Sequence, residues 1–277
     1  MSKEKTFPAR KLRILIPMIL FLSQTVCAQH ESKTINDSWK FHKGECEAAA
    51  SPAYDDSAWS SIHLPHTWNT DAYVEKKYYQ GTGWYRRTLT LPQNWQSKQV
   101  FLKLDAASKA ATIYINGKEV GEHNGGYTAC TFDITSFCSF DSPNSLAIRV
   151  DNARQDIPPI SADFTFFGGI YRDVWITAVS QQHFHLANHG SDGIFISTPQ
   201  VSEEIGTILI RGDIKNDAPR KAALELEHTI YNPDGSIAQT KKQSIQIKAG
   251  ELYSFRTETA PIPHPLLWTC LLYTSDA

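Results

Sequence analysis

Hydrophobic and polar residues alternate with a period of two along most of the chain after residue 39, and windows with a helical period are almost absent. The segment VFLKLDA (100–106) places a valine and two leucines on one face and a lysine and an aspartate on the other, and SLAIRVDN (145–152) repeats the pattern. Such alternation is typical of a strand with one buried and one solvated face. We therefore expect an all-β protein.

One pair of these strands is predicted to form a β-hairpin. In TIYINGKEVGEH (112–123), Asn116 and Gly117 follow a run of β-branched and aromatic residues. An Asn-Gly pair readily adopts the positive φ angles of a type I′ turn, which suits the twist of two antiparallel strands.

A second set of strands begins after about residue 180 and includes a turn, NPDG (232–235). The predicted strands are GIFIST (193–198), TILIRGDIKN (207–216), AALELEHTIYN (222–232) and SIQIKA (244–249). Short strands spaced about ten residues apart favour an immunoglobulin-like sandwich. The segment SQQHFHLANHGSD (180–192) is predicted to join the two sets.

The N-terminus is predicted to be a secretory signal peptide, residues 1–28. A 13-residue apolar stretch, 14–26, follows a basic run and is shorter than the roughly 20 residues of a membrane span. Cleavage after Ala28 leaves 277 − 28 = 249 residues and places the protein in the periplasm or outside the cell. The alternative, lipid attachment at Cys27, fits less well because Gln24-Thr25-Val26 are not the small residues that it needs.

Charge and cysteine content narrow the possible partners. The formal net charge is −2, and no basic cluster lies beyond the signal segment, so neither nucleic acid nor an anionic lipid surface is an expected partner. The remaining cysteines are too few and too irregular for a disulfide scaffold: Cys46, Cys130, Cys138 and Cys270. Cys130 is predicted to be a buried small hydrophobe, with a bridge to Cys138 as the alternative. No His/Cys spacing suggests a zinc site, so we expect no metal and no cofactor.

Five motifs follow one another in the first half of the chain: WSSIHLPHTWN (59–69), GTGWYRRTL (81–89), IYINGKEVGEHNGGYTACTFDIT (113–135), NSLAIRVDN (144–152) and DFTFFGGIYRDV (163–174). In this order and spacing they resemble glycoside hydrolase family 2, which contains β-galactosidases, β-glucuronidases and β-mannosidases. The resemblance extends over residues 35–268.

The resemblance implies a domain organisation. It implies a jelly-roll sandwich of the sugar-binding type over residues 29–180 and an immunoglobulin-like sandwich over 181–277. The tail TCLLYTSDA (269–277) departs from the family pattern, so the second sandwich is expected to be truncated at its C-terminus.

Asp163 is the candidate substrate-binding residue. Pro158 and Pro159 precede it and favour an extended loop that carries it away from the sheets. The resemblance implies that this aspartate enters the mouth of the catalytic barrel and contacts the sugar; a solvated loop carboxylate is the alternative. Phe164, Phe166 and Phe167 would then anchor the loop against that barrel.

The other notable motif residues are predicted to be structural. Aromatic packing and loop anchoring account for His66, Trp68, Trp84 and Tyr85. Gly125-Gly126 is predicted to be a backbone bend, and the Arg172-Asp173 dipeptide an ion pair where a strand begins. Asp151 and Asn152 end a strand and are predicted to organise a turn.

The catalytic residues of the family have no counterpart in this chain. Retaining glycosidases use two carboxylates about 5 Å apart, and the resemblance implies two glutamates on a (β/α)₈ barrel, one of them preceded by asparagine. The sequence contains no Asn-Glu dipeptide, and its adjacent glutamates, Glu203 and Glu204, are predicted to be a solvated pair in a turn. A barrel needs about 250 residues of alternating strands and helices. We expect the chain alone to be inactive.

The function that this implies is the non-catalytic front of a secreted exo-β-glycosidase, with a β-galactosidase-like member as the first expectation. Its carbohydrate substrate would bind through the missing barrel. A stand-alone carbohydrate-binding module is the second hypothesis and should show a planar row of exposed aromatic side chains. A cell-surface adhesion protein is the third and should show repeats or an anchor.

Overall fold

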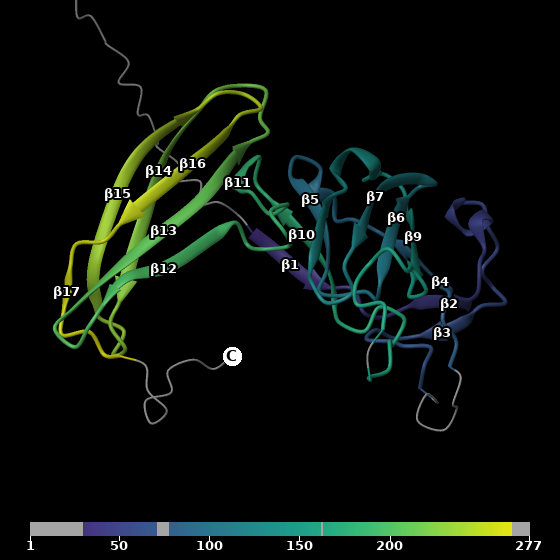
Figure 1. The fold of residues 1–277 in the computed structure, drawn as a ribbon. Coiled ribbons are helices and arrows are strands. Elements are labelled where there is room, and N and C mark those ends of the chain that lie inside the picture. The colour runs from purple at the N-terminus through teal and green to yellow at the C-terminus, as the bar shows by residue number, and fades with distance from the viewer. Residues whose placement is uncertain (1–29, 71–77, 162, 268–277) are drawn as a thin grey trace, which may run out of the picture.

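The computed structural model describes residues 30–70, 78–161 and 163–267, in which every regular element is a strand or a short 3₁₀ helix (Figure 1). The predicted all-β fold is therefore confirmed. The predicted signal peptide with Cys27, as well as Cys270 and the tail 269–277, lies outside the described residues. Within those residues, no helix is long and apolar enough to cross a membrane.

The first sandwich contains a six-stranded antiparallel sheet in the order β3-β2-β4-β9-β6-β7. Its strands are β2 (Trp39–Lys43), β3 (Ser60–Ile62), β4 (Thr82–Leu89), β6 (Ala110–Ile115), β7 (Lys118–Asn124) and β9 (Asn144–Asp151).

The opposite layer is a four-stranded antiparallel sheet in the order β1-β10-β5-β8. Its strands are β1 (His30–Thr34), β5 (Gln99–Leu104), β8 (Cys130–Asp133) and β10 (Val174–Val179). Three 3₁₀ helices lie in the connections: η1 (Glu47–Ala50), η2 (Gln93–Trp95) and η3 (Thr135–Phe137).

A continuous apolar core fills the space between these two sheets. Val100, Leu102 and Leu104 of β5 are fully buried in it, as the alternation predicts. Phe101 points to the opposite face and is nevertheless buried, because it packs with Val179 and Leu186. The predicted solvated face of β5 is thus covered in part by the segment after residue 180.

The predicted hairpin is present. Strands β6 and β7 pair antiparallel on either side of Asn116 and Gly117, whose φ angles are 52° and 80°. Two positive φ angles in succession are the mark of a type I′ turn.

Cys130 is buried, as predicted, and it is a free thiol, as are Cys46 and Cys138. Burial raises the pKa of Cys130 to about 12. The alternative bridge to Cys138 is not formed, because both thiols are free.

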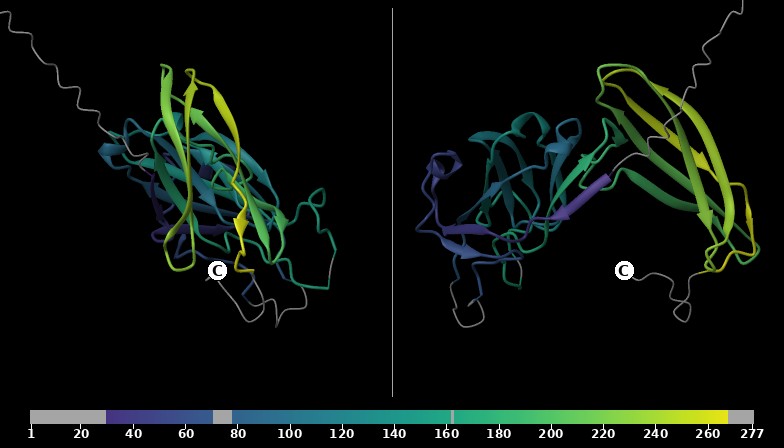
Figure 2. Two further views of the ribbon diagram at one scale, coloured as in Figure 1. Left: turned by 90° about the vertical axis from the view of Figure 1, so that its left-hand side faces the viewer. Right: turned by 180° about the vertical axis from the view of Figure 1, so that it is seen from behind.

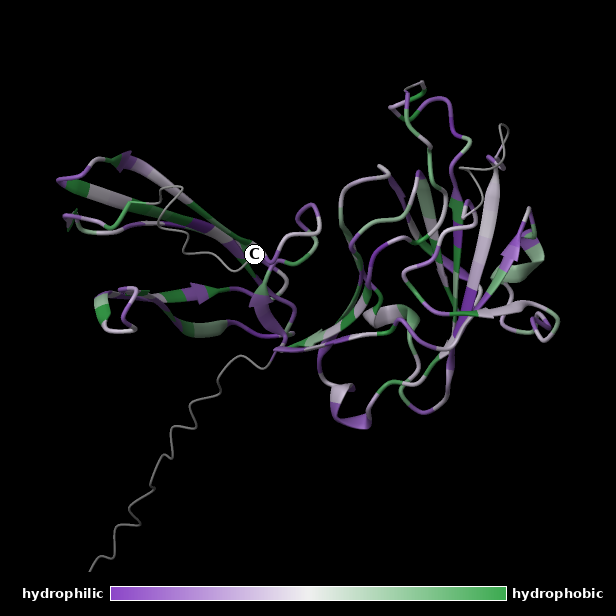
Figure 3. Ribbon diagram, turned by 90° about the horizontal axis from the view of Figure 1, so that it is seen from below, coloured by the Kyte–Doolittle hydropathy of each residue, from purple (hydrophilic) through white to green (hydrophobic). Residues whose placement is uncertain are grey.

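The second sandwich is smaller. Its main sheet is built on β13, which pairs with four other strands, and its second layer is the two-stranded sheet β14-β15. The strands are β11 (Gln182–Phe184), β12 (Ile194–Val201), β13 (Ile205–Asn216), β14 (Ala222–Tyr231), β15 (Ile237–Ile247), β16 (Leu252–Glu258) and β17 (Ile262–Pro263). Figure 3 shows hydrophobic and hydrophilic segments alternating along these strands.

Part of the predicted join belongs to the second sandwich, because β11 pairs with the C-terminal end of β13. The two groups of strands appear side by side in Figure 2. The core of the second group consists of Ile210, Ile214, Leu226, Ile245, Ile247 and Phe255.

Candidate functional site

Asp163 lies on the long connection between β9 and β10, which extends away from the strands at the lower side of the first sandwich in Figure 1. The carboxylate is exposed and makes no hydrogen bond or ion pair with another residue that the structure describes. Phe164 beside it is 51% exposed. The aspartate is thus free to accept hydrogen bonds from a ligand.

Asn152 holds the part of the connection that follows Asp163. Its side chain is 1% exposed, and its Oδ1 accepts a hydrogen bond of 2.8 Å from the Gly81 amide. Its Nδ2 donates to the Phe166 carbonyl at 3.0 Å. Asn152 was predicted only to organise a local turn, but its side chain also joins two segments that are 71 residues apart.

Asn69 is a second buried amide that holds the same connection. It is 2% exposed, accepts a hydrogen bond from the Gly168 amide at 2.7 Å and donates one to the Tyr79 carbonyl at 2.9 Å. Tyr78 adds a third contact, because its hydroxyl accepts a hydrogen bond from the Phe166 amide at 3.0 Å. The loop therefore returns to the sheets along a fixed path.

Asn69 and Tyr78 were not among the predicted site residues. Asn69 directly follows a buried tryptophan, and Asn152 directly follows a buried strand. A polar amide side chain next to buried residues, in two separate motifs, is the signal that could have identified them, because a buried amide must satisfy both its donor and its acceptor.

The glycine pair of DFTFFGGIYRDV is explained by close packing. A Cβ on Gly168 would lie 2.2 Å from a ring carbon of Trp68. Gly169 has a φ of +126°, and a Cβ there would lie 2.5 Å from the His66 carbonyl oxygen. Only glycine fits both positions, because each lets the backbone approach its neighbours directly.

The predicted aromatic packing is confirmed on both faces of β4, with Trp68 and Tyr85 in the core between the sheets and Trp84 on the opposite face. Trp68, Trp84 and Tyr85 are buried, and the His66 Nδ1 lies 2.8 Å from the Tyr85 hydroxyl. Burial lowers the pKa of His66 and raises that of Tyr85. Both rings are therefore neutral supports at ordinary pH.

The three phenylalanines do not share one role. Phe166 is 9% exposed and packs within its own sandwich, where the Lys109 ammonium lies 5.3 Å from the centre of its ring. It therefore cannot anchor the loop on another domain, contrary to the prediction. Phe164 contacts its edge at 5.2 Å between ring centres and remains exposed, and Phe167 is half-buried.

The predicted ion pair of Arg172 and Asp173 is wrong. Asp173 instead accepts a hydrogen bond of 2.9 Å from the Asn36 side chain. Arg172 is exposed, and its guanidinium lies 5.9 Å from the centre of the Tyr171 ring. Each of the two charged groups therefore has another neighbour, Asn36 for the carboxylate and Tyr171 for the guanidinium.

The predictions for the glycine pair at 125–126 and for the two adjacent glutamates at 203–204 are confirmed. Gly125 has a φ of +158° and begins a backbone bend. Glu203 and Glu204 are both exposed between β12 and β13. In the ranges that the structure describes, no group of three His, Cys, Asp or Glu side chains is placed to hold a metal ion.

Fold and loop together define a class of protein: a pair of β-sandwiches, the first of which presents an exposed carboxylate on a braced loop. Residues 23–179 match the family model described as "Glycosyl hydrolases family 2, sugar binding domain". The chain belongs to glycosyl hydrolase family 2.

Known relatives extend the likeness to most of the chain. A β-glucuronidase of Bacteroides fragilis is 30% identical over 236 residues, which cover 84% of this chain and 32% of that protein. A β-galactosidase of Bacteroides ovatus is 27% identical over 264 residues, which cover 91% and 30%. The chain thus spans about a third of the length of the curated relatives that it matches.

Among solved structures, a β-glucuronidase of Bacteroides uniformis superposes with a TM-score of 0.86 and 72% sequence identity. The match covers 87% of this chain and 29% of that one.

Proposed function

We propose that this chain is the N-terminal, non-catalytic portion of an exported family 2 exo-β-glycosidase that removes terminal β-linked sugars from oligo- or polysaccharides. The observation that carries the proposal is the match of nearly the whole chain to about 30% of proteins named as β-glucuronidases and β-galactosidases. The apolar stretch behind a basic N-terminus supports export.

A β-D-glucuronide is the first candidate substrate of the whole protein. It is favoured because the 72% identical structure is that of a β-glucuronidase. A β-D-galactoside, the expectation from the motifs alone, is the second candidate and is supported by the Bacteroides ovatus relative at 27% identity.

In this proposal Asp163 binds the sugar and does not react with it. Its carboxylate is exposed and free of protein partners, so sugar hydroxyls can donate to it. The bond-breaking step belongs to a pair of glutamates in the rest of the protein, one as nucleophile and one as acid and base. The Bacteroides uniformis β-glucuronidase 2 covalently bound to cyclophellitol-6-carboxylate aziridine supports a covalent step in such a relative.

The test joins the chain to its natural continuation and compares the product with the chain alone. Nitrophenyl β-glucuronide and nitrophenyl β-galactoside are the two substrates. We expect turnover of the glucuronide by the joined protein and none above buffer background by the chain alone. Turnover by the purified chain alone, or of neither substrate by the folded joined protein, would overturn the proposal.

A further inference from the structure

A buried lysine lies between the two ends of the connection that carries Asp163. Lys109 directly precedes β6 and is 4% exposed. Its backbone amide donates a hydrogen bond of 2.9 Å to the Asp151 carbonyl, where the connection begins. The preceding amide, of Ser108, donates one of 3.0 Å to the Gly169 carbonyl, near the end of the connection. The backbone therefore fixes Lys109 at the base of the loop.

The side chain of Lys109 reaches both arms of this loop. Its ammonium donates a hydrogen bond of 2.9 Å to the Arg154 carbonyl on the outgoing arm, residues 152–161. The same ammonium lies 5.3 Å from the centre of the Phe166 ring on the returning arm, residues 163–169. A buried positive charge is costly unless nearby groups compensate it, and the face of an aromatic ring attracts a cation. The two contacts therefore tie the arms to each other.

This tie lies closer to the aspartate than the one at the base of the loop. Asn152 joins the arms at the base, where its Nδ2 donates to the Phe166 carbonyl at 3.0 Å. The lysine adds a tie at Arg154, two residues further along the outgoing arm. On the returning arm, Phe164 lies against Phe166 at 5.2 Å between ring centres, and Asp163 directly precedes Phe164. A tie that leaves fewer residues free restricts the carboxylate more closely.

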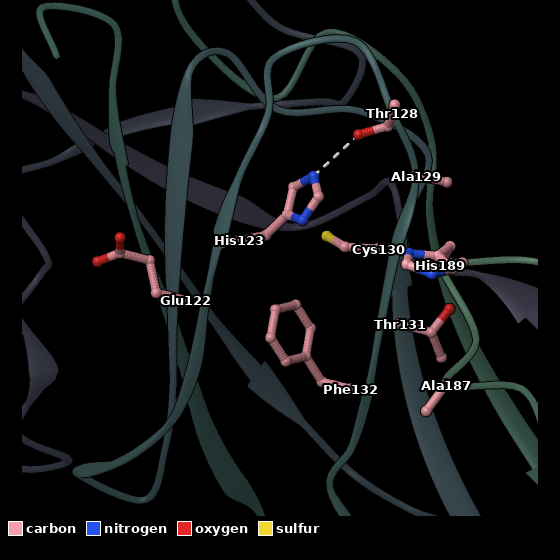
Figure 4. Close-up of a pocket in the computed structure, with 10 residues that line it drawn as sticks. Glu122, His123, Thr128, Ala129, Cys130, Thr131, Phe132, Ala187 and His189 are labelled. Atoms are coloured by element: carbon pink, nitrogen blue, oxygen red, sulfur yellow. Dashed lines mark hydrogen bonds between the residues drawn. The ribbon is translucent and has the colours of Figure 1, made fainter. Parts of the chain in front are cut away.

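The outgoing arm has a second support from the sheet, which is weaker. The Arg154 guanidinium lies 3.3 Å from the Glu122 carboxylate of β7. Figure 4, a close-up of the neighbouring pocket, shows this carboxylate directed away from the His123 and Phe132 rings. The two side chains of the pair are 30% and 37% exposed, and exposed ion pairs contribute little to stability. We therefore expect the buried ammonium to be the main support of this arm.

We propose that Lys109 is a positioning residue for Asp163: by joining the two arms, it limits where the carboxylate between them can lie. The inference rests on the proposed function, in which Asp163 accepts hydrogen bonds from the sugar. A loop that is already ordered loses less conformational entropy when a ligand binds. If only a fraction of the molecules hold the loop in the binding arrangement, the apparent affinity falls by that fraction. Lys109 should therefore act on KM and leave kcat unchanged.

The test is Lys109→Met, which removes the ammonium and keeps the length of the side chain. In the full chain, hydrogen exchange over residues 163–169 should become faster by about threefold or more. In the chain joined to its natural continuation, KM for the nitrophenyl glycoside that it hydrolyses should rise by about three- to tenfold at unchanged kcat. A fall in kcat at unchanged KM would indicate only that less protein is folded, and it would overturn the inference.

Lys98→Met is the matched control. Lys98 is also buried in the first sandwich, at 8% exposed, and its ammonium contacts the Glu31 carboxylate of β1. It directly precedes Gln99, which pairs with Val179 at the end of β10 that is far from the loop. Lys98→Met should lower the melting temperature and leave both KM and exchange over residues 163–169 unchanged.

Phe166→Leu removes the ring below the ammonium and serves as a second variant if Lys109→Met does not fold. It should change exchange and KM in the same direction. Unchanged exchange in the loop would overturn the inference, and so would an unchanged KM where Asp163→Asn raises KM. If Asp163→Asn also has wild-type kinetics, the proposed function fails instead, and the exchange data alone decide whether Lys109 fixes the loop.

Discussion

Both sandwiches of this chain are built from strands in which hydrophobic and polar residues alternate, but the opposite sheet covers the core to different extents in the two. In the first, the six-stranded and four-stranded sheets face each other, and Leu102, Ile113 and Ile148 between them are fully buried. In the second, a main sheet built on β13 faces a layer of only two strands. Among the described residues, neither β14 nor β15 has a strand partner on its outer edge.

Strand β12 shows the consequence most clearly. Ile196 pairs with Ile210, so the two side chains lie on the same face of the sheet. Ile210 is 5% exposed in the core, whereas Ile196 is 69% exposed. The inner face of the sheet is therefore covered at β13 and open at β12.

This contrast shows that alternation specifies a strand, whereas burial depends on what lies opposite that strand. It also explains why the candidate binding loop belongs to the first sandwich. A loop can present Asp163 at a fixed place only if its base is rigid, and Asn69 and Asn152 tie that base to a closed core.

Hydrogen exchange should show the largest contrast between the two sandwiches. Amides of β5 and β9 should exchange at least about a hundredfold more slowly than those of β12 and β14, because opening a closed core costs several kcal/mol more than opening an uncovered edge. Mass spectrometry of peptides from both regions measures this. Equal protection would mean that the second sandwich is as well closed as the first.

Two leucine substitutions, one in each core, measure the contrast between the sandwiches as a change in the free energy of unfolding. Leu102→Ala in the first core should cost about 2–5 kcal/mol, because a closed core cannot collapse onto the cavity. Leu226→Ala in the second should cost less, about 2 kcal/mol, because an open core relaxes more easily. Urea unfolding of both variants gives the two values, and a larger cost for Leu226→Ala would reverse the comparison.

Asn152→Ala should cost about 1–3 kcal/mol, because it leaves the half-buried Gly81 amide and the buried Phe166 carbonyl without partners. Exchange should also become faster over residues 163–170. The control is Asn232→Ala, at an exposed turn of the second sandwich, which should change stability by less than about 0.5 kcal/mol. Similar costs for both variants would show that the buried amide does not brace the loop.

The smallest expected effect is a dependence on acid pH. Hydrogen bonds from Arg149 and Trp84 hold the pKa of Glu45 at about 2, below its ordinary 4.5. A lowered folded pKa gives stability that is present above about pH 4.5 and lost as the pH falls toward 2. The carboxylate is 46% exposed, so solvent screening limits the gain to less than about 1 kcal/mol.

Thermal unfolding between pH 5 and pH 2.5 tests this dependence. Glu45→Gln should flatten the loss of stability in that window. Glu227→Gln in the second sandwich should change it less, since that carboxylate pairs with the single ammonium of Lys242 at 3.0 Å and not with the planar fork of an arginine. A steeper loss for Glu45→Gln would contradict the assignment.

The sequence predicted the strands whose apolar residues alternate strongly, and it placed the hairpin turn correctly at Asn116 and Gly117. It did not identify β16, where Phe255 is the one buried apolar side chain and Thr257 the other buried residue. It also predicted a solvated face for β5 that Leu186 covers from a distant segment. A local pattern carries no information about such long-range contacts.

The candidate site shows the same difference between local features, which the sequence predicted, and long-range contacts, which it did not. The exposed loop carboxylate was predicted from its prolines and its motif, because both are local features. The contacts of Asn152 with Gly81 and of Asn69 with Gly168 join residues 71 and 99 positions apart, and they could not be read from neighbouring residues. The ion pair of Arg172 and Asp173 was wrong because Asp173 accepts its hydrogen bond from Asn36, a residue 137 positions away that the local sequence could not indicate.

We propose that the first sandwich presents Asp163 as a sugar-binding group of a larger enzyme, and substitution of that residue in the joined protein is the decisive test. Asp163→Asn keeps the shape of the side chain and removes its charge. The lost hydrogen bonds to a charged group, about 1.5–3 kcal/mol, predict a fall in kcat/KM of roughly ten- to a hundredfold, with little change in melting temperature. Asp173→Asn, whose carboxylate contacts Asn36, should leave kcat/KM of the folded protein nearly unchanged. Wild-type kinetics for Asp163→Asn would show that this carboxylate does not bind the sugar.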